Sequence, residues 1–371
     1  MQRAWAEVNL ARLSQNIQQI IGQLGLATKL MAIVKADAYG HGAVEVSKAA
    51  LAAGASTLGV AWVTEALALR SAGITEPILV LSEPVSAEAL QIMVDMGLEA
   101  TVYSLDFAKE LDAAARRSGK TVDVHVKLDT GMGRVGATAS GALALIAWLS
   151  QESTLRWKGL YTHLARADEP SAVATPQQLE RFDLFKNTLV KNGLALVRHT
   201  QFIDSQTDRP ILLHAANSAA TRNFPQSHFD LVRVGFDMYN GALSFKTRVA
   251  LVKEVDAGQA LSYGGTYTTR GPSHIATLSA GYADGVDCRL GNVGRVLIGG
   301  RSYSMVGRVT MDMLLVDLGP GDPGVRRGDE AVLIGAQGRE HISIEEIAAA
   351  CGTIPYEIMC GIGKRVPRIY V

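Results

Sequence analysis

The segment at residues 30–42, LMAIVKADAYGHG, contains a lysine at a position where chemistry is possible. Five apolar residues at 30–34 predict a buried strand, and Lys35 follows directly at its end. Partial desolvation there would lower the pKa of the ammonium group, which makes a lysine usable as a nucleophile or base. The loop at 36–42 adds two glycines, a tyrosine and a histidine, which suit a ligand better than plain solvent. A lysine that only marks where a strand reaches the surface is the alternative.

A second candidate is the glycine-rich run at 131–136, GMGRVG, which has the G-x-G-x-x-G spacing. After a strand and before a helix, this spacing is typical of a dinucleotide site. The run follows the fifth predicted strand rather than the first of a βαβ unit, however, and the next strand, at 156–160, has no acidic residue. We therefore favour a tight turn that aims Arg134 into a site, since a guanidinium can hold a carboxylate or phosphate bidentately.

The elements that would position these residues alternate between strand and helix. Eight apolar strands are predicted at 30–35, 57–61, 77–81, 99–103, 122–128, 156–163, 211–214 and 230–234. Helices are predicted between most of them, at 43–53, 64–72, 86–96, 105–118, 140–149, 175–192 and 218–223, with Thr64 and Ser86 as caps. This alternation indicates an α/β fold with a parallel sheet. Eight strands fit a closed (β/α)8 TIM-type barrel with its chemistry at the carboxyl ends of the strands, and a doubly wound open sheet is the alternative.

The chain changes character after Tyr239. Short β-rich runs interrupted by Gly, Asp and Pro follow from residue 248 to 334, and a helix is predicted at 343–350 with Ser343 as its cap. We therefore predict two domains. Residues 1–240 would form the barrel, with the first few residues able to pair with the second domain. Residues 241–371 would form a mainly antiparallel β domain.

Composition excludes several classes of protein. The 36 basic and 36 acidic residues balance, which argues against a nucleic-acid or anionic-membrane partner. No apolar run approaches the ~18 residues that span a bilayer, and the N-terminus does not resemble a secretory signal. The three cysteines lack metal-ligand spacing and are typical of buried thiols in a reducing cytosol, so no metal is expected.

Taken together, the motifs resemble the alanine racemase family, whose members are pyridoxal-phosphate enzymes with a barrel domain and a C-terminal β domain. The resemblance covers nearly the whole chain and rests on ten segments in order. They are AWAEVNL at 4–10, MAIVKADAYGHG at 31–42, KLDTGMGRVG at 127–136, GLYTHLARADE at 159–169, HAANSAAT at 214–221, LVRVG at 231–235, SYGGTY at 262–267, GYADG at 281–285, GRVTMD at 307–312 and PYEIMCGIGKRVPR at 355–368.

The resemblance implies that pyridoxal 5′-phosphate is the cofactor and that Lys35 holds its aldehyde as an imine, then acts as a base. Arg233 matches the arginine that faces the pyridine nitrogen, where a permanent positive charge disfavours a proton. The other cofactor contacts that the resemblance implies are Tyr39, His163, Asn217, Ser218, Gly235, Phe236 and Tyr356.

Racemisation removes a proton from one face of the α-carbon and returns one to the other, so two bases are expected. Lys35 would serve one face, and Tyr263 matches the family's second base, which a partner subunit contributes. A tyrosine with a pKa near ~10 needs cationic or hydrogen-bonding neighbours to act as a base, and the resemblance places His163 and Arg233 nearby. It therefore implies a homodimer with shared sites. The substrate contacts that it implies are Arg134, Tyr282, Met311 and Asp312.

Lys127 matches a position at which the family often carries a lysine carbamylated by carbon dioxide, so the resemblance implies a candidate site for this modification. The expected function is the interconversion of L- and D-alanine in the cytoplasm, which supplies D-alanine for peptidoglycan. A serine or broad-specificity racemase, a basic-amino-acid decarboxylase and a non-catalytic cofactor-binding barrel are the alternatives. Tyr282 and Tyr356 would narrow the pocket in favour of alanine, but size selection against one hydroxyl is modest.

Overall fold

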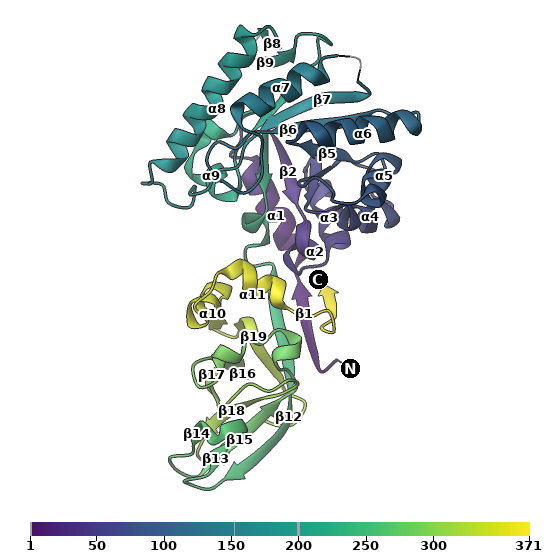
Figure 1. Cartoon of the computed structure of the whole chain (residues 1–371). Coiled ribbons are helices and arrows are strands. Elements are labelled where there is room, and N and C mark those ends of the chain that lie inside the picture. Colours follow the sequence, from purple (N-terminus) through teal and green to yellow (C-terminus); the bar gives the residue numbers. More distant parts are fainter. Residues whose placement is uncertain (1, 152, 199–200) are drawn as a thin grey trace. The chain divides into compact units, whose positions relative to one another are not determined.

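The computed structural model describes residues 2–151, 153–198 and 201–371. The chain divides into two compact units (Figure 1). The barrel unit comprises residues 14–38 and 46–238, and the β unit comprises residues 2–13, 39–45 and 239–371. Two short N-terminal segments therefore group with the C-terminal part of the chain. The domain boundary between residues 240 and 241 stays a prediction.

The barrel unit contains a parallel sheet of eight strands in the order β10-β7-β6-β5-β4-β3-β2-β11. Its strands are β2 (Lys29–Ile33), β3 (Thr57–Val60), β4 (Ile78–Val80), β5 (Glu99–Val102), β6 (Val122–Lys127), β7 (Leu155–Tyr161), β10 (Leu212–His214) and β11 (Leu231–Val234). The two edge strands meet, because Asp230 N donates to Leu213 O over 3.0 Å and Arg233 N to Ala216 O over 2.9 Å. The sheet is thus a nearly closed barrel, as predicted, and the doubly wound alternative was wrong.

Helices follow most of these strands. They are α3 (Ala43–Ala52), α4 (Val63–Ser71), α5 (Ala87–Asp95), α6 (Leu105–Arg117), α7 (Ala139–Leu149), α8 (Ala174–Lys191) and α9 (Ser218–Asn223), with α1 (Leu10–Ile21) before the first strand. In α6 the buried Phe107, Leu111 and Ala115 recur every four residues, the spacing of one helix face.

Caps and a hairpin show where the predictions of local structure succeeded and failed. Ser86 caps α5, as predicted, since its side chain accepts from Ala89 N. The predicted cap Thr64 was wrong, because α4 begins earlier, after Trp62, where Glu65 reaches back to the Trp62 amide. An antiparallel pair, β8 (Ala195–Arg198) and β9 (Gln201–Asp204), was not predicted.

The β unit is built on a nine-stranded, mainly antiparallel sheet. Six of its strands close a ring in the order β12-β15-β18-β17-β16-β19, because β19 pairs with β12 again. Strand β1 pairs antiparallel with β12 and parallel with β21. The nine strands are β1 (Ala4–Val8), β12 (Leu243–Val255), β15 (Ser273–Leu278), β16 (Arg295–Ile298), β17 (Arg301–Val306), β18 (Leu314–Gly319), β19 (Glu330–Gln337), β20 (Glu340–Ile342) and β21 (Arg368–Tyr370). A separate two-stranded sheet consists of β13 (Ala260–Leu261) and β14 (Tyr267–Thr268).

Two helices complete the β unit, α10 (Ile344–Ala350) and α11 (Pro355–Gly361). Ser343 caps α10 by accepting from Glu346 N. Within the part of the chain that the structure describes, no helix could cross a membrane. The same residues contain no group of three or more side chains that could hold a metal ion.

Candidate active site

Lys35 is held at the end of β2 by an unusual turn. The strand ends at Ile33, two residues earlier than predicted, and Lys35 begins the short element α2 (Lys35–Tyr39). Residues 36–39 all have φ of 53–54°, a left-handed turn that costs roughly 1–2 kcal/mol for each residue other than glycine. Glu65 stabilises the turn, because its two carboxylate oxygens accept from Ala36 N over 2.6 Å and from Ala61 N over 2.7 Å. Lys35 is half-buried there.

Several cationic side chains gather at the carboxyl ends of the barrel strands. Lys127, the last residue of β6, is buried, and Arg233 on β11 is buried as well. Burial, together with the charges of Arg233, Arg134 and Lys35, lowers the pKa of Lys127 to about 8. Burial also lowers the pKa of Arg233 to about 10. A cluster of this kind favours a ligand with more than one negative group, because anions would relieve the mutual repulsion.

Four neutral acceptors orient the guanidinium of Arg233. Nη2 donates to Thr162 O over 2.7 Å and to Ala215 O over 3.1 Å, and it lies 3.2 Å from His163 Nδ1. Nη1 lies 3.0 Å from His214 Nδ1. Burial and then the neighbouring cations, Arg233 first, lower the pKa of His163 well below its ordinary value. His163 is therefore a neutral acceptor beside Arg233 at neutral pH.

The ends of β10 and β11 are joined at Ser218. Its hydroxyl accepts from Gly235 N over 2.9 Å. Asn217 caps α9, with its side chain accepting from Ala220 N over 3.0 Å and donating to Leu164 O over 3.1 Å. Phe236 begins the short turn η2 (Phe236–Tyr239). Asn217, Ser218, Gly235 and Phe236, four of the predicted cofactor contacts, thus lie on two adjoining strand ends.

The loop at 131–136 turns on the carboxylate of Asp129. Its oxygens accept from Gly131 N over 2.9 Å and from Gly133 N over 3.0 Å. A Cβ atom at Gly136 would lie 2.8 Å from Asp129 N, so the tight return of the chain requires glycine. These amides are used within the loop rather than presented to a pyrophosphate, which favours the tight-turn interpretation. Arg134 is exposed at the tip.

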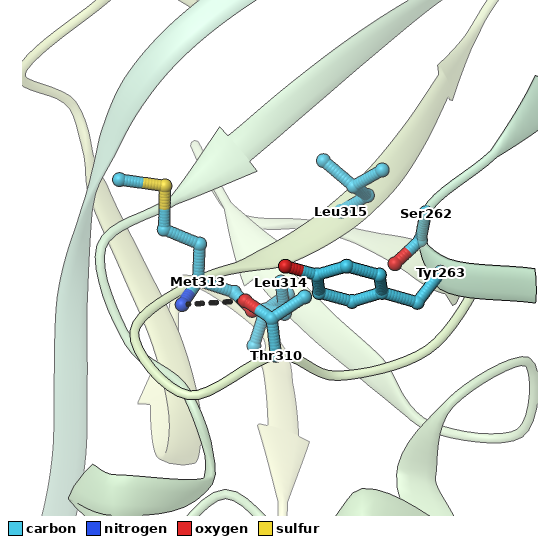
Figure 2. Close-up of a pocket in the computed structure, with 6 residues that line it drawn as sticks. All are labelled: Ser262, Tyr263, Thr310, Met313, Leu314 and Leu315. Carbon is cyan, nitrogen blue, oxygen red and sulfur yellow. Dashed lines mark hydrogen bonds between the residues drawn. The ribbon is translucent and has the colours of Figure 1, made fainter.

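In the β unit, Tyr263 projects from the protein with 72% of its surface exposed. It begins the turn η3 (Tyr263–Gly265) directly after Ser262, which has a φ of 61°. The Ser262 hydroxyl donates to Arg308 O over 2.7 Å and so holds this left-handed residue in place. Figure 2 shows the Tyr263 ring beside Thr310 and Leu314. The ring lines a cavity of about 290 Å³. The cavity is lined by Ser262, Tyr263, Thr310, Met313, Leu314 and Leu315.

The other predicted substrate contacts lie on two loops that are joined to each other. Tyr282 N donates to Thr310 O over 2.9 Å, which ties the turn η4 (Tyr282–Asp284) to the loop at 310–313. Arg365 donates to Asp312 over 2.7 Å and also to Asp284. Met311 and Asp312 are exposed.

Asp284 was not predicted, although it lies within the GYADG segment. Its side chain is fully buried and accepts from Arg3 and Arg365. Burial alone would raise the pKa of Asp284, but the hydrogen bonds from the two arginines outweigh it and lower the pKa to about 2. Asp284 therefore anchors both loops as a carboxylate.

Tyr39 and Tyr356 also belong to the β unit, with their ring centroids 6.1 Å apart. Burial raises the pKa of Tyr39. The structure thus brings together three groups of predicted residues. The barrel unit positions Lys35, Lys127, Arg134, His163, Asn217, Ser218, Arg233, Gly235 and Phe236. The β unit positions Tyr263, Tyr282, Met311 and Asp312 around one loop, and Tyr39 beside Tyr356.

Comparisons with known proteins agree with this arrangement. The profile described as "Alanine racemase, N-terminal domain" matches residues 8–242, and "Alanine racemase, C-terminal domain" matches residues 242–370. The chain belongs to the alanine racemase family. The alanine racemase of Symbiobacterium thermophilum is 42% identical, in an alignment that covers 100% of this chain and 97% of the relative.

Solved structures of alanine racemases have the same fold. The alanine racemase of Streptomyces coelicolor is similar with a TM-score of 0.90 and 37% identity, covering 100% of this chain and 98% of that chain. The alanine racemase of Bartonella henselae, solved with covalently bound pyridoxal phosphate, has a TM-score of 0.86 and 27% identity, covering 100% of both chains.

Proposed function

We propose that this protein is an alanine racemase that interconverts L- and D-alanine with pyridoxal phosphate as its cofactor. The observation that carries this proposal is the cationic cluster of Lys35, Lys127, Arg134 and Arg233, in a chain whose relatives are named alanine racemase. A phosphorylated cofactor and an amino-acid carboxylate supply the negative charges that such a cluster favours. The residues present therefore fit the group.

When bound, pyridoxal phosphate supplies the electron sink that makes the Cα proton of an amino acid removable. Lys35 would hold its aldehyde carbon, and Ser218, Gly235 and Tyr39 would hold its phosphate. Arg233 would face its pyridine nitrogen. Since a charged arginine disfavours a proton at that nitrogen, we expect it to suppress side reactions such as transamination.

Two side chains would move protons at the α-carbon of alanine. Lys35 Nζ would serve the face from which D-alanine loses its proton, and the Tyr263 hydroxyl would serve the opposite face, for L-alanine. Arg134 would hold the substrate carboxylate, aided by Met311 and Asp312, while Tyr282 would line the entrance. Because Tyr263 is exposed, its partners would come from a second copy of the chain.

A homodimer is therefore part of the proposal. Four large side chains of the β unit are exposed around one loop: Tyr263 at 72%, Met311 at 52%, Met313 at 46% and Tyr282 at 44%. Exposed apolar groups gathered in this way are typical of an interaction surface. We further propose that the enzyme acts in the cytoplasm and supplies D-alanine for peptidoglycan.

One experiment tests the function and its alternatives. Purified, cofactor-loaded protein is incubated with L-alanine, L-serine and L-lysine, while optical rotation and carbon dioxide release are followed, with Lys35→Ala as the matched control. We expect racemisation of L-alanine that the control lacks. Racemisation of L-serine at an equal rate would indicate a broad-specificity racemase, and carbon dioxide from L-lysine would indicate a decarboxylase. A loaded dimer that leaves L-alanine unchanged would refute the proposal.

A further inference from the structure

Four buried polar side chains of the barrel unit form a hydrogen-bonded series, which we call the buried relay: Glu99, His125, His214 and Arg233. Their exposed fractions are 6%, 1%, 0% and 4%. Glu99 Oε2 lies 3.2 Å from His125 Nε2, His125 Nδ1 lies 2.9 Å from His214 Nε2, and His214 Nδ1 lies 3.0 Å from Arg233 Nη1. Arg233 is the only one of the four that we assigned to the cofactor site.

The chemistry of the groups gives the relay a direction. A guanidinium can only donate, so His214 must accept at Nδ1 and, when neutral, carry its proton on Nε2. His214 then donates to His125 Nδ1, and His125 carries its own proton on Nε2 and donates to Glu99. Burial and the charge of Arg233 lower the pKa of His214 well below its ordinary value, in keeping with a neutral ring. The tautomer of each histidine is thus determined by the neighbouring group on its Arg233 side.

The fold makes room for this series. Strand β7 lies between β6 and β10, so the contact from His125 to His214 must pass over β7. The residue paired with His125 is Gly159, next to a register shift at which Lys158 is an extra residue in β7. A Cβ atom at Gly159 would lie 2.1 Å from His125 Nδ1. Tyr161 stacks on His214, with centroids 4.5 Å apart and planes 9° apart. Gly159 therefore leaves room for the His125 ring, and Tyr161 fixes the orientation of the His214 ring.

Glu99 supplies the final acceptor. Lys158 Nζ donates to its other oxygen, Oε1, over 2.5 Å. Burial alone would raise the pKa of Glu99, but the hydrogen bond from His125 and the charge of Lys158 outweigh it and lower the pKa. Glu99 is therefore a carboxylate at neutral pH. The relay therefore has a carboxylate, Glu99, at one end and a buried guanidinium, Arg233, at the other.

We propose that Glu99 and His125 are positioning residues for Arg233: they keep His214 in the form that accepts from the guanidinium and thereby hold Arg233 toward the cofactor's pyridine nitrogen. The inference rests on the proposed function for what Arg233 faces. The relay itself is a property of the chain and can be tested without cofactor.

Glu99→Gln tests the direction of the relay. Lys158 Nζ lies 2.5 Å from Oε1, and an NH₂ group at that place would meet the ammonium donor to donor. The amide oxygen must therefore face Lys158, and the amide NH₂ must face His125 Nε2. His125 then has to carry its proton on Nδ1, where it would face the Nε2–H of His214 donor to donor. In ¹⁵N spectra of imidazole-labelled, cofactor-free protein we expect His125 and His214 to leave the Nε2–H form. In the loaded enzyme we expect an altered visible absorption and a kcat at least about tenfold lower, or about 1.4 kcal/mol, with KM changed less than about threefold.

Two further variants separate the effect of hydrogen-bond direction from the loss of the Glu99 charge and from a general disruption of the structure. In Glu99→Gln/Lys158→Met no donor opposes the amide, so its oxygen can face His125, and we expect the wild-type imidazole spectrum and much of the kcat to return. Asp123→Asn is the matched control. Asp123 is the second acceptor of Lys158, at 3.1 Å, but lies outside the relay, so we expect no change in either reading.

A Glu99→Gln protein with wild-type imidazole spectra and a kcat within about twofold of wild type would overturn the proposal. So would a double variant as impaired as the single one. If the single variant does not fold, the spectra of the double variant decide: Nε2–H rings support the relay and Nδ1–H rings overturn it. A wild-type protein that does not racemise alanine would refute the proposed function alone, because the spectra are recorded without cofactor.

Discussion

Tyr263 owes its exposed position to the residue before it. Ser262 has a φ of 61°, a conformation that residues other than glycine rarely adopt, and its hydroxyl is bonded to Arg308 O. This strained serine sets the direction of the chain at Tyr263, whose ring lies beside Thr310 and Leu314 (Figure 2) and stays 72% exposed. At the scale of single residues, the role of each proposed base can therefore be tested by removing one functional group.

Tyr263→Phe removes the proposed proton carrier for L-alanine while keeping the ring. We expect racemisation to fall by roughly 10²–10⁴-fold, the usual range for loss of a general acid or base, with cofactor binding at Lys35 intact. In deuterated water, exchange of the α-proton of D-alanine without inversion should persist, whereas exchange into L-alanine should nearly stop. Proton NMR of both enantiomers measures this.

Tyr267→Phe is the control for that experiment. Tyr267 lies four residues after Tyr263, and its hydroxyl donates to Asp317 over 2.6 Å. Loss of this hydroxyl therefore removes only a structural hydrogen bond. We expect exchange rates close to those of wild type. Near-wild-type racemisation by Tyr263→Phe in both directions would contradict the two-base scheme.

Lys127 is expected to react with carbon dioxide. Only the neutral amine reacts, forming a carbamate and releasing a proton, and a pKa of about 8 makes that form accessible near neutral pH. With ¹³C-bicarbonate we expect a carbamate signal in the carbon NMR spectrum that grows as pH rises toward 8 and is absent from Lys127→Met. Lys158, whose pKa its carboxylate partners raise in spite of burial, provides the control, since Lys158→Met should keep the signal. A high-resolution map without extra density on Lys127 would refute the modification.

At the scale of elements, two short turns carry the proposed chemistry, and buried or bridging carboxylates hold both. Glu65 joins the left-handed turn after Lys35 to the loop before α4. Asp284 joins the N-terminal strand region, through Arg3, to the loops that carry Tyr282 and Asp312. Each carboxylate accepts from a backbone N–H that would otherwise lack a partner: Glu65 from Ala36 N, and Asp284 from Gly281 N.

Glu65→Gln should loosen the turn that follows Lys35. An amide has one acceptor oxygen, so either Ala36 N or Ala61 N would face an NH₂ group. We expect a loss of about 1–3 kcal/mol in the free energy of unfolding and weaker retention of pyridoxal phosphate, measured by chemical denaturation and by dialysis. Glu88→Gln, an exposed change in the first turn of α5, should leave both unchanged. Full retention of the cofactor by Glu65→Gln would show that the turn does not depend on Glu65.

Asp284→Asn should destabilise the β unit and change its response to acid. The carboxylate is buried but Arg3 and Arg365 are partly exposed, so we expect a loss of roughly 1–3 kcal/mol in the free energy of unfolding from the lost hydrogen bonds. The pKa of Asp284 is about 2 in the folded chain and 3.8 as the ordinary value, so its stabilising effect is complete above pH 3.8 and is lost as pH falls toward 2. The variant should lack that part of the acid dependence in denaturation experiments from pH 7 to pH 2.

Asp322→Asn is the matched control, because its pair with Arg326 is exposed on both sides. An exposed pair contributes roughly 0–1 kcal/mol, so this variant should retain the wild-type acid dependence. An Asp284→Asn protein with the same acid transition as wild type would exclude Asp284 as the anchor.

At the scale of the whole molecule, the proposed residues are divided between two units. The cationic cluster belongs to the barrel unit and Tyr263 to the β unit. If each site combines the barrel unit of one subunit with Tyr263 of another, then two inactive variants should complement each other.

Mixing Lys35→Ala with Tyr263→Phe tests this. After joint unfolding and refolding of equal amounts, about half of the molecules should be mixed dimers, each with one intact site of two, so about a quarter of wild-type activity should return. Refolding each variant alone is the control and should recover almost none. A mixture as inactive as its components would exclude shared sites.

Much of this arrangement could be predicted from the chain alone. The eight strands of the barrel were predicted because apolar runs of strand length alternate with helix-length segments, and that periodicity is local. The left-handed turn at 36–39 was not predictable, because Ala and Tyr disfavour positive φ and Asp adopts it only as a single residue, not in a run of four. Thr64 was wrong as a cap for a related reason: Glu65, which also reaches the amides of Ala36 and Ala61, displaced the start of α4.

The sequence by itself determined the family, the order of the elements and the position of Lys35 at a strand end, because these depend on residue types and spacings along the chain. Only the tertiary structure decided which polar groups meet. Glu99, His125, His214 and Arg233 lie on four strands and are separated by up to 134 residues in the numbering. Their contact depends on strand order, on a register shift and on the missing side chain of Gly159. Hydrogen bonds at 3 Å require distances and directions that no local pattern encodes.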